Sequence, residues 1–211
     1  MTAGMTVTLL HTAEVHRSRF DDLRDQISPD AELRHVVRPR WLQRAQDGSA
    51  AALEEEIAGV VARAQGPVLC TCTTLGPVAE SAGAMRVDWP MMRAAAGAQG
   101  PVLMAFCLES TYVPSLALLE RALAEGGTPQ KVYPLPMPQY WPLFEAGETD
   151  AFDAVIAGEV RQAVAAQGDV AAVVLAQASM AGAAARLEDL SVPVLSSPEL
   201  ALRAVLDVAG G

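Results

Sequence analysis

Short apolar runs alternate with longer amphipathic stretches along almost the whole chain. A Gly-Pro pair precedes two of these runs, at residues 68–72 and 102–107. Between the runs, apolar residues recur at helical spacing, as they do over residues 150–166. Parallel strands give this pattern, because the chain must return through a covering helix before the next strand can begin. The alternation therefore predicts an α/β fold.

The composition supports parallel sheets and limits the partners. A chain of 211 residues is long enough for one large domain or for two small α/β lobes. Aromatic residues make up only 5% of it although 51% is hydrophobic, which suits aliphatic parallel strands better than an aromatic-rich sandwich. The net charge of −10 disfavours binding to nucleic acid or to an anionic membrane surface. We therefore expect neither nucleic acid nor a membrane as a partner.

The sequence also suggests a cellular location. Residues 1–15 lack the basic segment and apolar run of a secretory signal. The longest apolar stretch without charges, residues 170–185, is shorter than the roughly 18–20 residues of a membrane span. Three irregularly spaced cysteines do not form a disulfide framework. These features predict a cytoplasmic protein with reduced thiols; the oligomeric state is left open, a homo-oligomer included.

Several cofactor-dependent chemistries are not expected. Lys131 is the only lysine and lies in a proline-rich stretch, which argues against a pyridoxal-phosphate Schiff base. The histidines, His11, His16 and His35, show no metal-site spacing with cysteines or carboxylates. The glycine-rich nucleotide loops and the serine nucleophile elbow are also missing from the sequence. We expect no cofactor and no metal.

Two segments of the chain resemble each other. Residues 68–76 and 174–182 share the pattern V-L-x-x-x-[ST]-x-x-G. In each, a buried strand runs into a small polar turn and then a helix, so both turns lie at the carboxyl ends of strands. The repeat predicts two related lobes. We place the first at residues 1–99 with 196–211, where the C-terminal helix returns, and the second at residues 100–195.

At these turns the chain resembles the aspartate/glutamate/hydantoin racemase superfamily. The family's first turn commonly reads C-x-T, which Cys72-Thr73-Thr74 fits. Its second often reads V-L-G-C-A-G-M, and residues 174–180 follow that motif without a gap. The resemblance implies two pseudo-symmetric α/β lobes, each a short parallel sheet flanked by helices, with an interlobe cleft. It also implies a cofactor-independent isomerase acting on a small carboxylate or hydantoin-like substrate.

The chain departs from the family at the second turn. Family members carry one cysteine in each lobe, and the two thiols take and return a proton on opposite faces of the substrate. Gln177 occupies the second cysteine position in the family register, and Ala178 occupies it in the register of the internal repeat. Neither register supplies a second thiol. One-thiol decarboxylase or lyase chemistry, and a non-catalytic carboxylate-binding protein, therefore remain as alternatives.

Cys72 is the predicted catalytic residue. It follows a strand and precedes a helix, where backbone N–H groups favour a thiolate, although a free cysteine is also a common small core residue. The predicted substrate-binding residues are polar groups near strand ends, some of them implied by the resemblance: Thr73, Thr74, Ser110, Thr111, Gln177, Ser179, His11 and Thr12. Gln177 has two interpretations, since its amide can satisfy buried backbone groups or orient a substrate.

Three further residues near the predicted site are interpreted as structural rather than catalytic. Cys70 lies two residues before Cys72, so an extended strand points both side chains to the same face, and we expect Cys70 to pack in the core. Cys107 ends a predicted strand, and we expect it to pack as well. Glu109 is interpreted as an exposed residue at a helix entry rather than as a second acid or base.

Overall fold

The structure, a computed structural model, describes residues 5–127 and 129–210, with only the backbone of residues 49–51. The chain divides into two compact units, residues 1–87 with 198–211 and residues 88–197. The boundary precedes helix α5 (Trp89–Ala96), which packs on elements of the second unit. The sequence analysis placed these residues in the first lobe.

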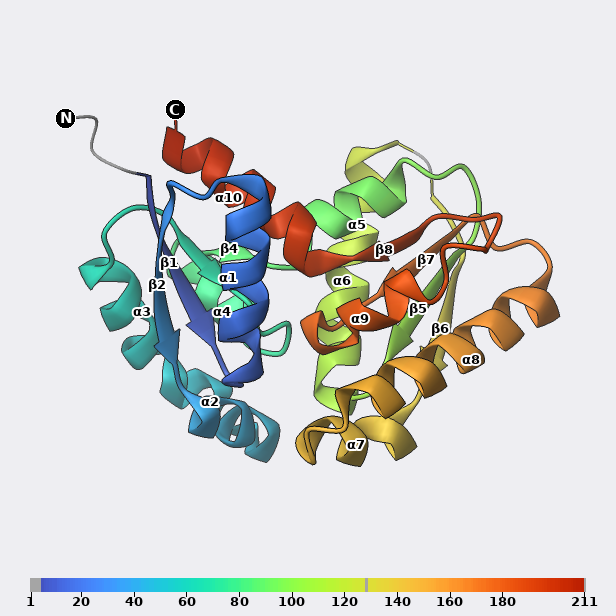
Figure 1. The fold of residues 1–211 in the computed structure, drawn as a ribbon, viewed down its shortest axis with the longest axis horizontal. Coiled ribbons are helices and arrows are strands. Elements are labelled where there is room, and N and C mark those ends of the chain that lie inside the picture. Colours follow the sequence, from blue (N-terminus) through green and yellow to red (C-terminus); the bar gives the residue numbers. More distant parts are fainter. Residues whose placement is uncertain (1–4, 128, 211) are drawn as a thin grey trace. The chain divides into compact units, whose positions relative to one another are not determined.

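A four-stranded parallel sheet forms the centre of the first unit (Figure 1). Its strand order is β2-β1-β3-β4. The strands are β1 (Thr6–His11), β2 (Glu32–Val37), β3 (Val68–Cys70) and β4 (Met85–Arg86). The short β3 is fully buried and lies between β1 and β4, in register with Leu10 opposite Cys70. Because the strands are parallel, the segments that follow them all leave from the same edge of the sheet.

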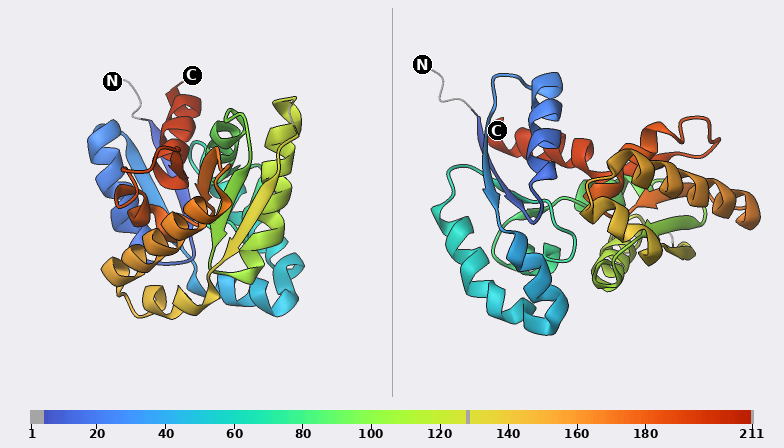
Figure 2. Two further views of the ribbon diagram at one scale, coloured as in Figure 1. Left: turned by 90° about the vertical axis from the view of Figure 1, so that its right-hand side faces the viewer. Right: turned by 60° about the horizontal axis from the view of Figure 1, so that its bottom comes forward.

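Helices cover both faces of this sheet (Figure 2). On one face Leu9 and Phe20 lie in a core formed with helices α1 (Val15–Ile27) and α10 (Ser197–Gly210). On the other face Ile57 and Cys70 lie in a second core. The elements on that side are α2 (Pro39–Arg44), η1 (Ala45–Ser49), η2 (Ala50–Leu53), α3 (Glu54–Arg63) and α4 (Gly76–Ser81).

The second unit also has a four-stranded parallel sheet, in the order β6-β5-β7-β8. Its strands are β5 (Val102–Phe106), β6 (Val132–Pro136), β7 (Ala172–Leu175) and β8 (Val194–Ser196). Pro134 and Pro136 lie on β6, at the edge of the sheet. Proline has no N–H to give to a neighbouring strand, so an edge is where a sheet tolerates it.

Helices again cover both faces of the sheet. Leu103 and Ala105 point to a core with Phe152 and Ile156, and the ring of Phe106 stacks against Tyr112 at 5.0 Å between ring centres on the opposite face. The first side has η3 (Pro138–Tyr140), α7 (Trp141–Glu145), α8 (Thr149–Gln167), η4 (Ala178–Met180) and α9 (Ala181–Ala185). The second side has α5 and α6 (Glu109–Glu125).

The two sheets have the same strand order when β1–β4 are matched to β5–β8 in sequence. This confirms the predicted fold class of two α/β lobes, each a parallel sheet flanked by helices. Within the described residues, no helix combines the length and apolar character needed to cross a membrane.

Candidate functional site

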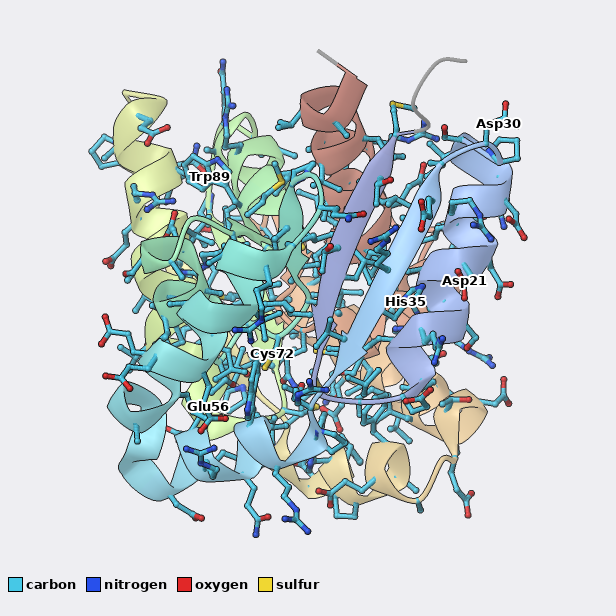
Figure 3. The ribbon with its side chains drawn as sticks, turned by 90° about the vertical axis from the view of Figure 1, so that its left-hand side faces the viewer. Asp21, Asp30, His35, Glu56, Cys72 and Trp89 are labelled. Atoms are coloured by element: carbon cyan, nitrogen blue, oxygen red, sulfur yellow. The ribbon has the colours of Figure 1, made fainter. Side chains whose placement is uncertain are left out.

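Cys72 follows β3 and precedes the turn that opens α4. It lies toward the end of the sheet at which β1 and β2 terminate (Figure 3), and it is 8% exposed. Cys70 belongs to the same apolar cluster, which confirms that the two side chains share a face. The Cys70 thiol donates a hydrogen bond to the Cys72 carbonyl, with 3.6 Å between sulfur and oxygen. Cys70 therefore supports the strand end from within the core.

The threonines after Cys72 form the turn itself. The carbonyl of Thr73 accepts a hydrogen bond from the backbone N–H of Gly76 at 3.0 Å, which closes the turn. Thr73 is buried and Thr74 is half-buried. Both hydroxyl-bearing residues thus lie next to the thiol, as the C-x-T pattern predicts.

Arg86 is a residue of this region that the sequence analysis missed. It ends β4 opposite Cys70 and is only 5% exposed. Its guanidinium lies over the backbone of Gly76, where an added Cβ would come within 2.7 Å of Nε. Its Nη1 lies 4.0 Å from Oε2 of Glu80, so one carboxylate already pairs with this guanidinium, which favours anionic groups near the turn. The available sequence signal was an arginine ending a short strand of a chain with few basic residues.

His11 lies at the end of β1 with both ring nitrogens engaged. Nδ1 is 2.8 Å from the Thr71 hydroxyl, and Nε2 is 2.8 Å from Nδ1 of His35. Burial, followed by the charges of His16 and His35, lowers the pKa of His11 to about 3, so its ring is neutral at physiological pH. The neighbouring Thr12 is half-buried. A direct substrate contact from His11 or Thr12 stays a prediction.

Hydrogen bonds at the strand ends determine which residue of the second unit corresponds to Cys72. The N–H of Thr71 bonds the carbonyl of Leu10 at 2.9 Å, and in the second sheet Ala176 N–H bonds the Ala105 carbonyl at 2.9 Å. Thr71 and Ala176 are therefore counterparts, and the next residues, Cys72 and Gln177, correspond as well. The register of the family motif is the structural one, and the repeat register that gave Ala178 is shifted by one residue.

The side chain of Gln177 forms hydrogen bonds with the backbone that follows the neighbouring strand, β5. It is 6% exposed, and its side-chain oxygen accepts hydrogen bonds from Cys107 N–H at 2.6 Å and Leu108 N–H at 3.0 Å. The amide oxygen thus satisfies two N–H groups where β5 leads into α6. Two roles were considered for Gln177, satisfying buried backbone groups and orienting a substrate. This contact corresponds to the first of them.

The hydroxyl residues of the second unit lie near the same end of their sheet. Ser179 is 4% exposed in η4, and its Oγ has no hydrogen-bond partner among the described residues. Thr111 is buried and Ser110 half-buried in the first turn of α6, beside the exposed Glu109. Substrate binding by Ser110, Thr111 and Ser179 remains untested.

Cys107 differs from Cys72 in its surroundings. It is 1% exposed within the main apolar cluster of the second unit, and burial raises its pKa to about 12. A thiol that stays protonated is a poor nucleophile and a poor base. In the described ranges, no three His, Cys, Asp or Glu side chains are grouped to hold a metal ion.

The comparisons with known proteins identify the fold. No protein-family model and no curated protein sequence matches the chain. Among solved structures, glutamate racemase from Bacillus anthracis superposes with a TM-score of 0.69 at 16% identity, covering 100% of this chain and 83% of that one. Allantoin racemase from Pseudomonas fluorescens gives 0.67 at 11% identity, with 97% and 91% covered. The fold is that of the aspartate/glutamate/hydantoin racemases.

This fold is not restricted to racemases. A variant of arylmalonate decarboxylase also superposes, with a TM-score of 0.59 at 14% identity, covering 98% of this chain and 93% of that one. At such identities the likeness extends to the racemase fold alone. The chemistry of the chain must therefore be argued from its own residues.

Proposed function

We propose that the chain is a cofactor-independent enzyme that moves a proton at the carbon next to a carboxylate or a hydantoin-type carbonyl, using Cys72 as its single thiol. One observation carries the proposal. In the racemase fold, Cys72 follows the third strand of the first sheet, and its counterpart in the second sheet is Gln177. The first unit thus has a thiol at this strand end, and the second unit has an amide at the equivalent strand end.

A single thiol predicts chemistry on one face of the substrate. The Cys72 thiolate takes the proton next to the carbonyl, and the thiol then returns a proton to the same face. A side-chain amide is neither an acid nor a base at neutral pH, so Gln177 cannot serve as a second proton-transfer group. Exchange with retained configuration is the expected outcome, rather than racemisation.

The surroundings of Cys72 suit an anionic substrate and intermediate. The buried Arg86 guanidinium lies over the Gly76 turn, and the threonines beside Cys72 carry hydroxyl donors. Removing the proton places negative charge on the carbonyl oxygen, which such donors stabilise most when they are held in place before the reaction. This is the environment that supports a small carboxylate or hydantoin-like substrate.

Decarboxylation is the second candidate, favoured by the single thiol and by the decarboxylase among the similar structures. In that reaction the C–CO2 bond breaks and its electron pair stays on carbon. The Cys72 thiol then gives its proton to that carbon, and the thiolate regains a proton from water. One thiol is sufficient because a proton is only delivered, never removed from the opposite face.

Incubation in heavy water tests the proposed function. Aspartate, glutamate, a 5-substituted hydantoin and an arylmalonate are each followed by NMR and by chiral chromatography. We expect deuterium to enter next to the carbonyl of one of these acids or hydantoins while its optical purity is kept. Release of CO2 from the arylmalonate would favour the second candidate. Deuterium entry with inversion, or thermal stabilisation by a compound that is never turned over, would contradict the proposal.

A further inference from the structure

A row of hydrogen bonds runs through the first unit from α1 to the segment that carries Cys72. Asp21 Oδ1 is 3.2 Å from Nε2 of His35, and Nδ1 of His35 is 2.8 Å from Nε2 of His11. Nδ1 of His11 is 2.8 Å from the Thr71 hydroxyl, which donates to the Leu10 carbonyl at 3.0 Å. Figure 3 shows His35 on β2 beside Asp21 of α1. We call Asp21, His35, His11 and Thr71 the relay.

When the Thr71 hydroxyl donates to Leu10, counting donors gives the direction of every other bond in the relay. The Thr71 hydroxyl has one hydrogen, which points at Leu10, so Thr71 accepts from Nδ1–H of His11. His11 is neutral, and its Nε2 must therefore accept from Nδ1–H of His35. When His35 also carries a proton on Nε2, it donates to the Asp21 carboxylate. Every hydrogen bond of the row is then made. The rings of His11 and His35 together carry three N–H protons, one more than two neutral imidazoles have.

Loss of that extra proton reverses the row. The charge-assisted bond to Asp21 keeps the remaining proton of His35 on Nε2, so Nδ1 becomes an acceptor. His11 must then donate from Nε2 and accept at Nδ1, where the Thr71 hydroxyl turns to meet it. The hydroxyl leaves the Leu10 carbonyl, which still accepts the backbone N–H of Thr71 at 2.9 Å. Three of the four hydrogen bonds therefore survive, two of them in the opposite sense, and only the bond from the Thr71 hydroxyl to Leu10 is lost.

We propose that Asp21, His35 and His11 are positioning residues for Cys72, and that the proton held by the relay sets the direction of the hydroxyl of Thr71, the residue that precedes Cys72 in the chain. The inference rests on the proposed function only in taking Cys72 as the reacting group. Thr71 lies between Cys70 and Cys72, and the relay holds it from the α1 face of the sheet. The Cys70 thiol holds the Cys72 carbonyl from the other face. The strand end is thus held by hydrogen bonds on both faces of the sheet.

The charged and titratable groups around the relay come from β1, β2 and α1. Arg24 lies 3.7 Å from Asp21, and Arg17 acts on His11 from the same helix. The ring centre of His16 is 6.2 Å from that of His11, and burial lowers the pKa of His16 to about 4. His16 and His11 are therefore neutral at pH values where imidazoles usually titrate.

Alkylation of Cys72 tests the relay without any substrate. Iodoacetamide is added to the full chain over a range of pH, and mass spectrometry follows each cysteine. The rate at Cys72 should depart from a single thiol ionisation by about threefold, the effect of about one neutral hydrogen bond. It should climb less steeply once the relay proton is lost, because a positive charge has left its neighbourhood. Cys107 should resist alkylation throughout.

Two variants separate the relay from general electrostatics. Asp21→Asn removes the carboxylate that holds the extra proton, and the inflection should move to lower pH. Asp22→Asn removes the same charge from an exposed residue of α1 next to Asp21 in the chain, so the inflection should stay in place. A wild-type profile with one ionisation, or equal shifts in both variants, would overturn the proposal.

Nitrogen-15 NMR of the imidazole rings gives a second readout in the wild-type protein. The ring proton of His11 should move from Nδ1 to Nε2 as the pH rises through the inflection. A tautomer that stays the same on both sides would reject the relay even if the Asp21 variant did not fold. Neither measurement depends on turnover, so a failed relay and a failed enzyme are distinguishable.

Discussion

Replacing Gln177 with leucine should lower the free energy of unfolding by about 2–4 kcal/mol. Leucine fills a similar volume but cannot accept the hydrogen bonds from Cys107 N–H and Leu108 N–H. A buried donor left without a partner costs about 1–3 kcal/mol, and here two donors are affected, one of them only partly buried. Urea unfolding followed by circular dichroism measures the loss.

Two variants control for the change at Gln177. Gln177→Glu keeps an acceptor oxygen at the same place and should lose less than the leucine variant. Gln162→Leu replaces an exposed glutamine on α8 and should stay within about 0.5 kcal/mol of the wild type. If Gln177→Leu were as stable as Gln162→Leu, the assigned bonds would contribute nothing to the fold, contrary to the account.

Gly66→Ala should be the most destabilising small substitution in the first unit, at about 3–5 kcal/mol. Gly66 has a φ of +77°, and a Cβ there would overlap the backbone carbonyl oxygen of Thr6. The left-handed conformation alone costs a non-glycine residue about 1–2 kcal/mol, and displacing β1 from the turn adds a similar amount or more.

Gly83→Ala is the matched control for this prediction. Gly83 has a φ of +95°, yet no atom lies within 4 Å of the position its Cβ would take. Its cost should be limited to the backbone conformation, about 1–2 kcal/mol. Equal losses of stability in Gly66→Ala and Gly83→Ala, measured by denaturant unfolding, would show that the approach of Gly66 to β1 is unimportant.

The strands were predictable from sequence because parallel strands buried on both faces are short apolar runs. The apolar runs at residues 68–72 and 102–107 begin at the first residues of β3 and β5 and extend past their ends by two residues and one residue. The helix after Cys72 was expected and is α4, whereas the short helices α2 and α7 were missed. Each begins with a proline at its first or second position. Pro39 was interpreted as a strand breaker, whereas proline's fixed φ also suits the start of a helix.

The sequence could not predict those parts of the site that depend on contacts between residues far apart in the chain. The motif around Cys72 is local, so the sequence could indicate the thiol and its threonines. The Arg86 guanidinium lies over Gly76 only because β4 returns beside β3. The relay joins His11 to His35, 24 residues away, and to Thr71, 60 residues away. Neither spacing has a sequence signature, because strand order and helix packing bring these side chains together.

The second turn shows a different limit. The family motif and the internal repeat gave two registers for this turn, and they differ by one residue. Only the paired bonds of Thr71 and Ala176 decide between them, and they make Gln177 the counterpart of Cys72. The absence of a thiol at that position was predictable; the bonds that the glutamine oxygen makes to the β5 end were not.

The most direct test of the central claim compares two cysteine variants in the heavy-water exchange assay. Cys72→Ala should reduce deuterium entry by at least about a hundredfold, the usual contribution of a positioned acid or base. Cys107→Ala removes a buried thiol from the core of the second unit and should keep the wild-type rate within about twofold while it remains folded. Wild-type exchange by a folded Cys72→Ala protein would contradict the assignment of Cys72 as the single functional thiol.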